Sequence, residues 1–209
     1  MAAQLSSSGP GQCTCIQADL RSEAACVAVA DYLKANHVPS LDILINNAAK
    51  RSADDSLWSP APQQPVWDSV LGVSLSAAYF LTRAVLPLLI ASRHQCARVI
   101  NVTSVSGLAV PPYDANAYIA AKAALNHLTR ALAFQLAPHN ILVNAIAPGV
   151  VKSRENQAVV VPGGHVPIGR LGDADDVAGI TLFLCSRASG YVTGQVIALD
   201  GGLLVKSSL

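Results

Sequence analysis

Apolar runs alternate with segments of helical spacing along this chain. Three of the runs, Leu41 to Asn46, Ala97 to Thr103 and Ile141 to Ile146, are almost continuously apolar. Runs of this length and composition are typical of strands that are buried on both faces of a sheet. A shorter run, Val196 to Leu199, precedes a pair of glycines and predicts the last strand.

The segments between these strands carry apolar residues at helical intervals. They predict helices over Ser22 to Asn36, Val66 to Ser92, Ala115 to Leu136 and Asp173 to Cys185, with a kink at Pro87. Acidic residues in the first turn of the last helix suit the helix macrodipole. Strands that alternate with helices predict an α/β fold of three layers, with helices on both faces of a parallel sheet.

The remaining segments fall into one strand and two loops. Cys13 to Ala18 predicts a further short strand that ends at Asp19. Arg51 to Pro65 is polar and contains three prolines, so it predicts a loop. Val150 to Leu171 combines Gly, Pro and a valine cluster, which predicts a loop over a pocket. No repeat or internal boundary is visible, so we expect residues 1–209 to form a single domain.

Composition narrows the class of protein. Hydrophobic residues make up 52% of the chain and charged residues 13%, which favours a large core and a buried interface in a homo-oligomer. The net charge of +1 offers no electrostatic basis for binding nucleic acid or an anionic membrane. The strongly apolar stretch from Ala84 to Ala91 is too short to span a bilayer. Five scattered cysteines and an N-terminus without signal-peptide features predict a cytoplasmic protein with reduced thiols.

The segment Tyr118-Ile119-Ala120-Ala121-Lys122 carries the candidate chemistry, and Ser104 lies upstream of it. One helical turn places the phenol and the ammonium on the same face, about 5–6 Å apart at Cβ. A charge at about 4 Å in a medium of dielectric about 20 contributes about 4 kcal/mol, which would lower the pKa of the phenol by about three. Such a pair could transfer a proton near pH 7. Taken alone, a Tyr-x-x-x-Lys segment is more often a surface tyrosine and a solvated lysine than a catalytic pair.

Several short motifs surround this pair in a fixed order. They are Asn46-Asn47-Ala48-Ala49, then Ser104 with Tyr118 and Lys122, then Pro148-Gly149-Val150-Val151, and last Arg170-Leu171-Gly172. In this order and spacing, from about Cys13 to Gly202, the chain resembles the short-chain dehydrogenase/reductase family. The resemblance implies a Rossmann-like sheet and an oxidoreductase that uses NADP, or NAD, on a carbonyl or an alcohol. It also implies assembly into a dimer or a tetramer.

The resemblance also implies a role for each matching residue. Tyr118 would exchange a proton with the substrate oxygen, Lys122 would lower its pKa and bind the nicotinamide ribose, and Ser104 would orient the substrate oxygen. The implied cofactor contacts besides Tyr118 and Lys122 are Asp19 at the adenine, Asn47, Arg83, Val151 and Ser153. Arg83 could equally be a solvated charge on the helix surface. Ser153 could equally cap a turn.

The chain departs from the family pattern in two ways. Ser74 stands where the family has an asparagine that holds a proton-relaying water, so Ser74 is expected to serve that relay. The glycine-rich phosphate loop and its strand–helix–strand unit are missing, and Ser8 to Gly11 cannot replace that loop. We therefore expect the chain to be truncated at its N-terminus relative to the family.

Three hypotheses follow from this combination of features. The first is an NADP-dependent oxidoreductase of secondary metabolism that acts on a mostly apolar small molecule, such as a polyketide-like or lipid-like ketone. The second is a cofactor-independent isomerase, dehydratase or cyclase that uses Tyr118 and Ser104. The third is a non-catalytic relic of the family that serves as an assembly subunit. His165 is interpreted as an ordinary loop residue.

Overall fold

A computed structural model describes residues 6–7, 10–93, 96–152 and 166–205. Its described strands form one parallel sheet in the order β1-β2-β3-β4. The strands are β1 (Ile43–Asn46), β2 (Ala97–Val102), β3 (Ile141–Pro148) and β4 (Val196–Leu199). Their positions confirm the four strands that the apolar runs predict.

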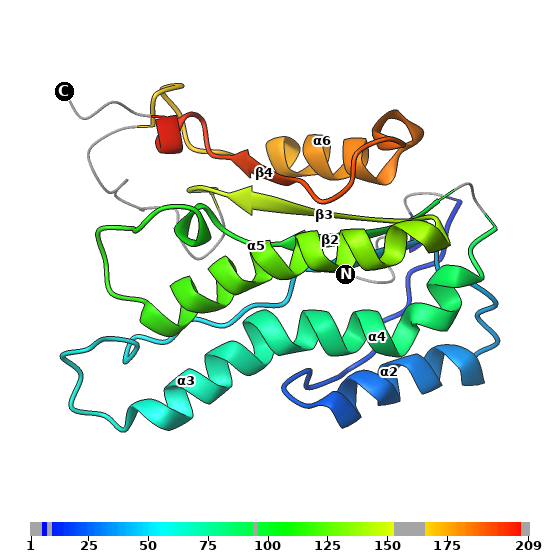
Figure 1. Ribbon diagram of the computed structural model, residues 1–209, viewed down its shortest axis with the longest axis horizontal. Coiled ribbons are helices and arrows are strands. Elements are labelled where there is room, and N and C mark those ends of the chain that lie inside the picture. Colours follow the sequence, from blue (N-terminus) through cyan, green and yellow to red (C-terminus); the bar gives the residue numbers. More distant parts are fainter. Residues whose placement is uncertain (1–5, 8–9, 94–95, 153–165, 206–209) are drawn as a thin grey trace.

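Helices cover both faces of this sheet (Figure 1). Helix α4 (Ala77–Ile90) lies against β1 and β2, and α5 (Asn116–Leu136) lies against β3. Helix α2 (Glu23–Ala35) packs on α4, and α6 (Ala174–Cys185) covers the opposite face at β2 and β3. The arrangement confirms a Rossmann-like three-layer fold.

Shorter helical pieces connect these elements. They are α3 (Gln63–Leu71), the π-helical η1 (Gly72–Ser76) and the 3₁₀ turns η2 (Val105–Gly107), η3 (Ala137–His139), η4 (Arg187–Ser189) and η5 (Leu203–Val205).

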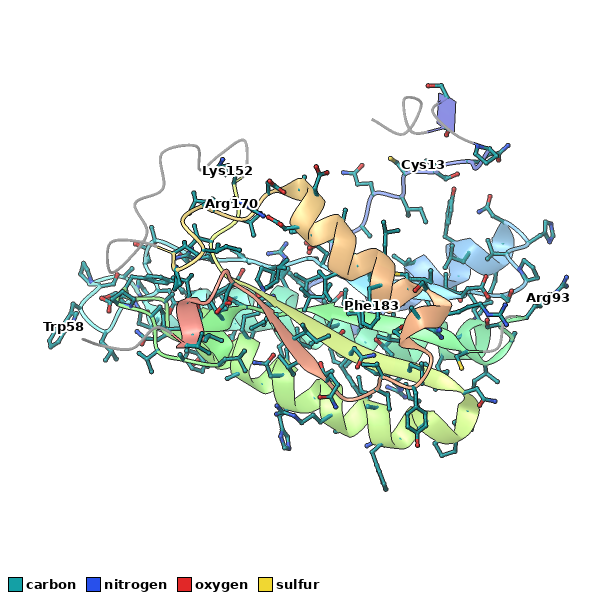
Figure 2. The ribbon with its side chains drawn as sticks, turned by 90° about the horizontal axis from the view of Figure 1, so that it is seen from above. Cys13, Trp58, Arg93, Lys152, Arg170 and Phe183 are labelled. Atoms are coloured by element: carbon teal, nitrogen blue, oxygen red, sulfur yellow. The ribbon has the colours of Figure 1, made fainter. Side chains whose placement is uncertain are left out.

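The segment Cys13 to Ala18 does not form the strand that its sequence predicts. It is exposed and has no regular structure, and Cys13 stands away from the sheet (Figure 2). A strand is stable only when its backbone groups pair with a neighbour. Within the described residues β1 pairs with β2 alone, so no partner holds Cys13 to Ala18 in the sheet.

Strand β1 also differs from the prediction of burial on both faces. Leu44 and Asn46 are buried, but Ile43 and Ile45 are 39% and 43% exposed. The alternation arises because α4 covers one face of β1, whereas α6 lies against β2 and β3 on the other face. The apolar run of β1 therefore reflects a half-buried edge strand in the described part of the sheet.

The predicted helix over Val66 to Ser92 is three consecutive helical pieces. The π-helical η1 joins α3 to α4, and Pro87 lies within α4 without ending it. By length and composition, the run Gln63–Ile90 is apolar enough to cross a membrane. In the fold its α4 part packs against α2, β1 and β2, as the core helix of a globular protein does.

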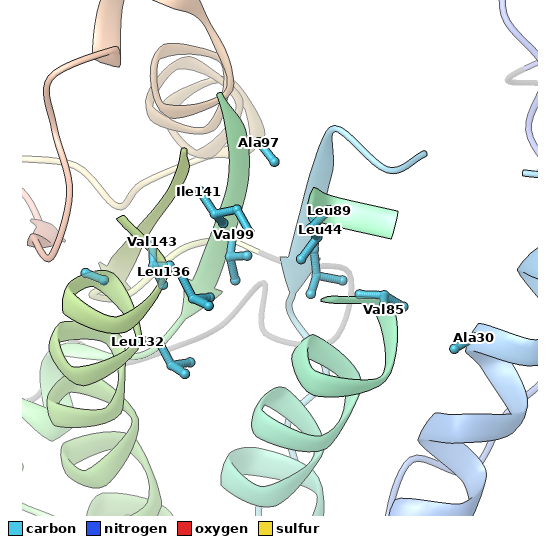
Figure 3. Close-up of a cluster of buried hydrophobic side chains, with 11 residues drawn as sticks. Ala30, Leu44, Val85, Leu89, Ala97, Val99, Leu132, Leu136, Ile141 and Val143 are labelled. Carbon is cyan, nitrogen blue, oxygen red and sulfur yellow. The ribbon is translucent and has the colours of Figure 1, made fainter. Parts of the chain in front are cut away.

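The main core lies between the sheet and the layer of α2, α4 and α5 (Figure 3). Its centre is made of aliphatic side chains from three strands and these helices: Ala30, Leu44, Val85, Leu89, Ala97, Val99, Leu132, Ala133, Leu136, Ile141 and Val143. A second, smaller cluster of Ile100, Ile146 and Leu184 joins α6 to the opposite face.

Leu89 and Ile90 offer a test of this core, because they are adjacent in α4 but only Leu89 is buried. Leu89 is 1% exposed and Ile90 is 51% exposed. We expect Leu89→Ala to lower the free energy of unfolding by about 3 kcal/mol, through lost burial and a residual cavity. Ile90→Ala should lower it by less than about 1 kcal/mol. Denaturant unfolding measures both, and equal losses would contradict this position of α4.

Candidate active site

The candidate site lies at the carboxyl end of the sheet, where the loops after β1, β2 and β3 come together (Figure 1). Ser104 follows β2 in an extended conformation and is 8% exposed. Its hydroxyl accepts a hydrogen bond from the Ser106 amide at 3.1 Å and so begins η2. The serine side chain is thereby fixed at the end of the strand.

Lys122 is buried in the second turn of α5, one turn after Tyr118, with 1% of its surface exposed. Its ammonium donates a hydrogen bond to the Val102 carbonyl at 2.6 Å. It lies 5.6 Å from the centre of the Tyr118 ring. Burial lowers the pKa of Lys122 to about 8, because desolvation disfavours the charged amine.

The pKa of Tyr118 is raised, which corrects the lowering that its spacing from Lys122 predicts. Burial is the largest cause, since it disfavours the phenolate. Hydrogen bonding to Ser104 and the charge of Arg51 both act in the opposite direction. The sequence argument fails because it takes no account of burial, the largest cause of the shift.

Arg51 is a member of this site that the sequence analysis misses. Its guanidinium lies over the rings of Tyr113 and Tyr118, 5.0 and 5.5 Å from their centres. It comes from the loop after β1, more than sixty positions before the tyrosines, so no local pattern links them. A cation on the face of an aromatic ring is favourable and places a positive charge beside the phenol.

Asp55 is a second missed residue, from the same loop. Its carboxylate is 3% exposed and accepts hydrogen bonds from the amides of Ala117 at 2.8 Å and Tyr118 at 3.1 Å. An aspartate in a polar loop ordinarily predicts a solvated residue, and the sequence carries no signal of this contact.

Ser74 lies in η1 and is fully buried. Its hydroxyl accepts a hydrogen bond from the Lys50 amide at 2.9 Å and donates one to the Lys50 carbonyl at 3.2 Å. Ser74 therefore holds the chain just after Asn46 to Ala49. Its part in a proton relay to Lys122 stays a prediction.

The residues proposed to bind the cofactor lie at several places. Asn47 is exposed just beyond β1, next to a cavity of about 120 Å³ that Asn46, Ala48 and Ser74 also line. Asp19 is exposed and pairs with Arg21, whose hydrogen bonds lower the pKa of the carboxyl.

Arg83, on the surface between α4 and α2, forms an ion pair with Glu23 at 2.6 Å. Val151 bridges to Gly172 in the loop after β3, and Ser153 and His165 lie outside the described residues. The structure thus places Val151 at the same end of the sheet as Ser104. The ion pair of Arg83 with Glu23 is not predicted by the sequence.

These side chains fit the nicotinamide half of NADP by the chemistry of their donors. Lys122, Tyr118 and Asn47 supply N–H and O–H groups; of these three residues Lys122 is buried, whereas Asn47 is exposed. Hydroxyls of a ribose and an amide of a nicotinamide are suitable acceptors for such groups. For the phosphates, the described residues before α2 contain no glycine-rich turn between a strand and a helix.

Comparisons with known proteins agree with this geometry. A family model described as Enoyl-(Acyl carrier protein) reductase matches residues 1–204. The rhamnolipids biosynthesis 3-oxoacyl-[acyl-carrier-protein] reductase of Pseudomonas aeruginosa is 37% identical over 204 residues, which cover 92% of this chain and 77% of that protein. The 3-oxoacyl-[acyl-carrier-protein] reductase FabG of Thermotoga maritima is 36% identical over 170 residues, 79% of this chain and 67% of FabG.

Solved structures show the same likeness. The Pseudomonas aeruginosa RhlG/NADP active-site complex has a TM-score of 0.85 and 36% identity, and the match covers 96% of this chain and 80% of that one. The acetoin dehydrogenase YohF of Salmonella typhimurium has a TM-score of 0.77 and 30% identity over 92% of this chain and 76% of its own.

Replacing Arg51 tests its charge on the phenol. We expect Arg51→Gln to raise the pKa of Tyr118 further, because the cation that favours the phenolate is lost. Arg51→Lys keeps the charge and should leave the pKa closer to that of the wild type. A tyrosinate absorbance titration, with Tyr118→Phe to identify the signal, measures the change. Arg83→Gln is the control, and a titration of Arg51→Gln that overlays the wild type would contradict the assignment.

Burial of Lys122 should make stability depend on pH. Its pKa falls from 10.5 in the unfolded chain to about 8 in the fold, so the unfolded state binds more protons between these values. The cost of burying the charge is full below pH 8 and disappears as pH rises toward 10.5. The free energy of unfolding should therefore rise by about 3 kcal/mol across this window, relative to Lys122→Met. Urea unfolding of both proteins at the two ends of the window measures the difference, and parallel pH dependences would refute it.

Proposed function

Because this chain belongs to the short-chain dehydrogenase/reductase family, we propose that it is an NADP-dependent oxidoreductase that interconverts a ketone and an alcohol. The observation that carries the proposal is the placement of Ser104, Tyr118 and Lys122 together at the carboxyl end of the sheet. Tyr118 acts as the general acid and base, Ser104 orients the substrate oxygen, and Lys122 assists.

In the direction of reduction, Tyr118 gives its proton to the substrate oxygen. Its raised pKa keeps the phenol protonated near pH 7, which suits a proton donor. The hydroxyl of Ser104 donates a hydrogen bond to the same oxygen as negative charge develops there. NADPH, when bound, supplies the hydride that the carbonyl carbon receives.

Lys122 is the group that returns a proton to Tyr118. A pKa of about 8 lets the amine exist in both protonation states near physiological pH. The backbone carbonyl of Val102 holds the amine near the phenol ring whichever state it is in. The buried position keeps this exchange away from bulk water.

The substrate we propose is a ketone on an apolar chain, of the 3-oxoacyl kind. Large apolar side chains are exposed on the loops that lead to the site, with Leu57 82%, Trp58 86% and Val110 89% exposed. Trp58 projects outward from its loop (Figure 2). An exposed apolar rim suits an acyl chain better than a sugar or an amino acid. Two relatives bear the name 3-oxoacyl-[acyl-carrier-protein] reductase, which supports this class.

The remaining parts of the proposal concern the cofactor and the assembly. Asn47, Val151 and Ser153 would hold the nicotinamide half of NADP and Asp19 its adenine, with Arg83 available for this only if it leaves Glu23. Exposed Phe134 (85%) and Tyr191 (104%) support assembly into a homo-oligomer, and we place this assembly in the cytoplasm as part of the proposal.

A cofactor-independent isomerase, dehydratase or cyclase is the second candidate. It is favoured by the hydrogen bond between the side chains of Tyr118 and Ser104, because this pair can move a proton without a cofactor. Tyr118 and Ser104 alone could then move a proton next to a carbonyl.

One experiment separates the two candidates. The 209-residue chain is titrated with NADPH by calorimetry and then assayed for oxidation of NADPH with a panel of 3-oxoacyl thioesters and simple ketones. We expect binding and turnover, and we expect Tyr118→Phe to lower kcat by about 10²–10⁴-fold while NADPH still binds. Tyr191→Phe, an exposed tyrosine, is the matched control. Absence of NADPH binding at millimolar concentration would exclude the oxidoreductase for this chain, and turnover without NADPH would favour the second candidate.

A further inference from the structure

The first turn of α5 is held from outside the helix. Its N-cap residue, Ala115, has no side chain that could accept a hydrogen bond. Ala117 and Tyr118 are the second and third residues of the helix. Their amides therefore lack the local acceptor that a serine or aspartate at the N-cap would supply. The two carboxylate oxygens of Asp55 accept one amide each, at 2.8 and 3.1 Å.

The carboxylate of Asp55 is itself firmly placed. It is 3% exposed, so the amides of α5 replace water as its partners. The neighbouring Ser56 donates a hydrogen bond to Asp114 at 2.6 Å, which is a second tie between the same loop and the chain before α5. The Asp55 amide also donates to the Ser52 carbonyl at 3.4 Å. The loop is thus closed onto α5 at two adjacent residues.

The contact between Asp55 and α5 includes Tyr118, the proposed acid. One of the two amides that Asp55 accepts is the amide of Tyr118 itself. Fixing that amide fixes the backbone from which the phenol projects toward Ser104. A hydrogen bond from an amide to a buried carboxylate is among the stronger ones in proteins and gains from the positive end of the helix.

We infer that Asp55 is a positioning residue, which orients the phenol of Tyr118 by anchoring the first turn of α5. The inference rests on the proposed role of Tyr118 as general acid and base. Asp55 touches neither substrate nor cofactor in this scheme. A shift of about 1 Å in the position of a catalytic group can lower the rate about a hundredfold, so the anchor is directly coupled to kcat.

The test compares Asp55→Ala and Asp55→Asn with Asp54→Asn, an exposed neighbour in the same loop. Asp55→Asn keeps the side-chain volume and one accepting oxygen. Its kcat should therefore fall less than that of Asp55→Ala, and it should fold even if Asp55→Ala does not. We expect kcat to fall about a hundredfold for alanine and about tenfold for asparagine, with the KM for NADPH unchanged. Asp54→Asn should match the wild type. Ser56→Ala removes the hydrogen bond to Asp114 but keeps the Asp55 carboxylate, so it should lower kcat less than Asp55→Asn does.

Two readouts distinguish positioning from a purely structural role. The pH profile of kcat and the tyrosinate titration of Tyr118 should both change in the Asp55 variants, because the phenol leaves its buried position. A purely structural role would lower the melting temperature and leave the profile and the kcat of the folded fraction intact. That result in both variants would overturn the inference.

The inference also has a test that does not need turnover. Amide hydrogen exchange should accelerate at Ala117 and Tyr118 in the Asp55 variants and stay unchanged in the middle of α5. If the wild type shows no turnover, the proposed function fails, while faster exchange and a shifted titration of Tyr118 would still support the anchor. Unchanged exchange at both amides would refute the anchor whatever the activity.

Discussion

The buried ammonium of Lys122 constrains how this end of the molecule can be built. An amine taken out of water needs a hydrogen-bond acceptor, and here the acceptor is the carbonyl of Val102 at the end of β2. Helix α5 must therefore lie close to the carboxyl end of β2. Gly107 permits this approach, because a Cβ at that position would lie 2.6 Å from the carbonyl carbon of Lys122. Gly107 and Lys122 thus form one close contact between the turn after β2 and α5.

The rest of α5 repeats this pattern with neutral groups. Asn126 donates to the Gly107 carbonyl at 3.0 Å, and Asn101 in β2 donates to Thr129 at 2.9 Å. Asn46 at the end of β1 donates in turn to Asn101 at 2.9 Å. These bonds join β1, β2 and α5 across the sheet and set the register of the helix on its strands. The positions of Ser104 and Tyr118 follow from that register.

The sequence predicts the features that depend on local pattern. Apolar runs locate the strands, helical spacing locates α2, α5 and α6, and one turn of helix relates Tyr118 to Lys122. It does not predict Asp55 or Arg51, because their contacts depend on the path of a loop about sixty residues away along the chain. It also misjudges Cys13 to Ala18, since a strand depends on a neighbour that composition does not reveal.

The pKa of Tyr118 depends on its burial more than on its spacing from Lys122. Spacing gives the distance between two Cβ atoms, whereas the pKa depends on burial and on where the ammonium points. In the structure burial disfavours charge on both groups, raising the pKa of Tyr118 and lowering that of Lys122 to about 8. A neutral phenol can donate a proton but cannot accept one. Reduction of a carbonyl needs the donor, and oxidation of an alcohol needs the phenolate. In the proposed mechanism, the protonated phenol of Tyr118 therefore suits the step in which the substrate oxygen receives a proton during reduction.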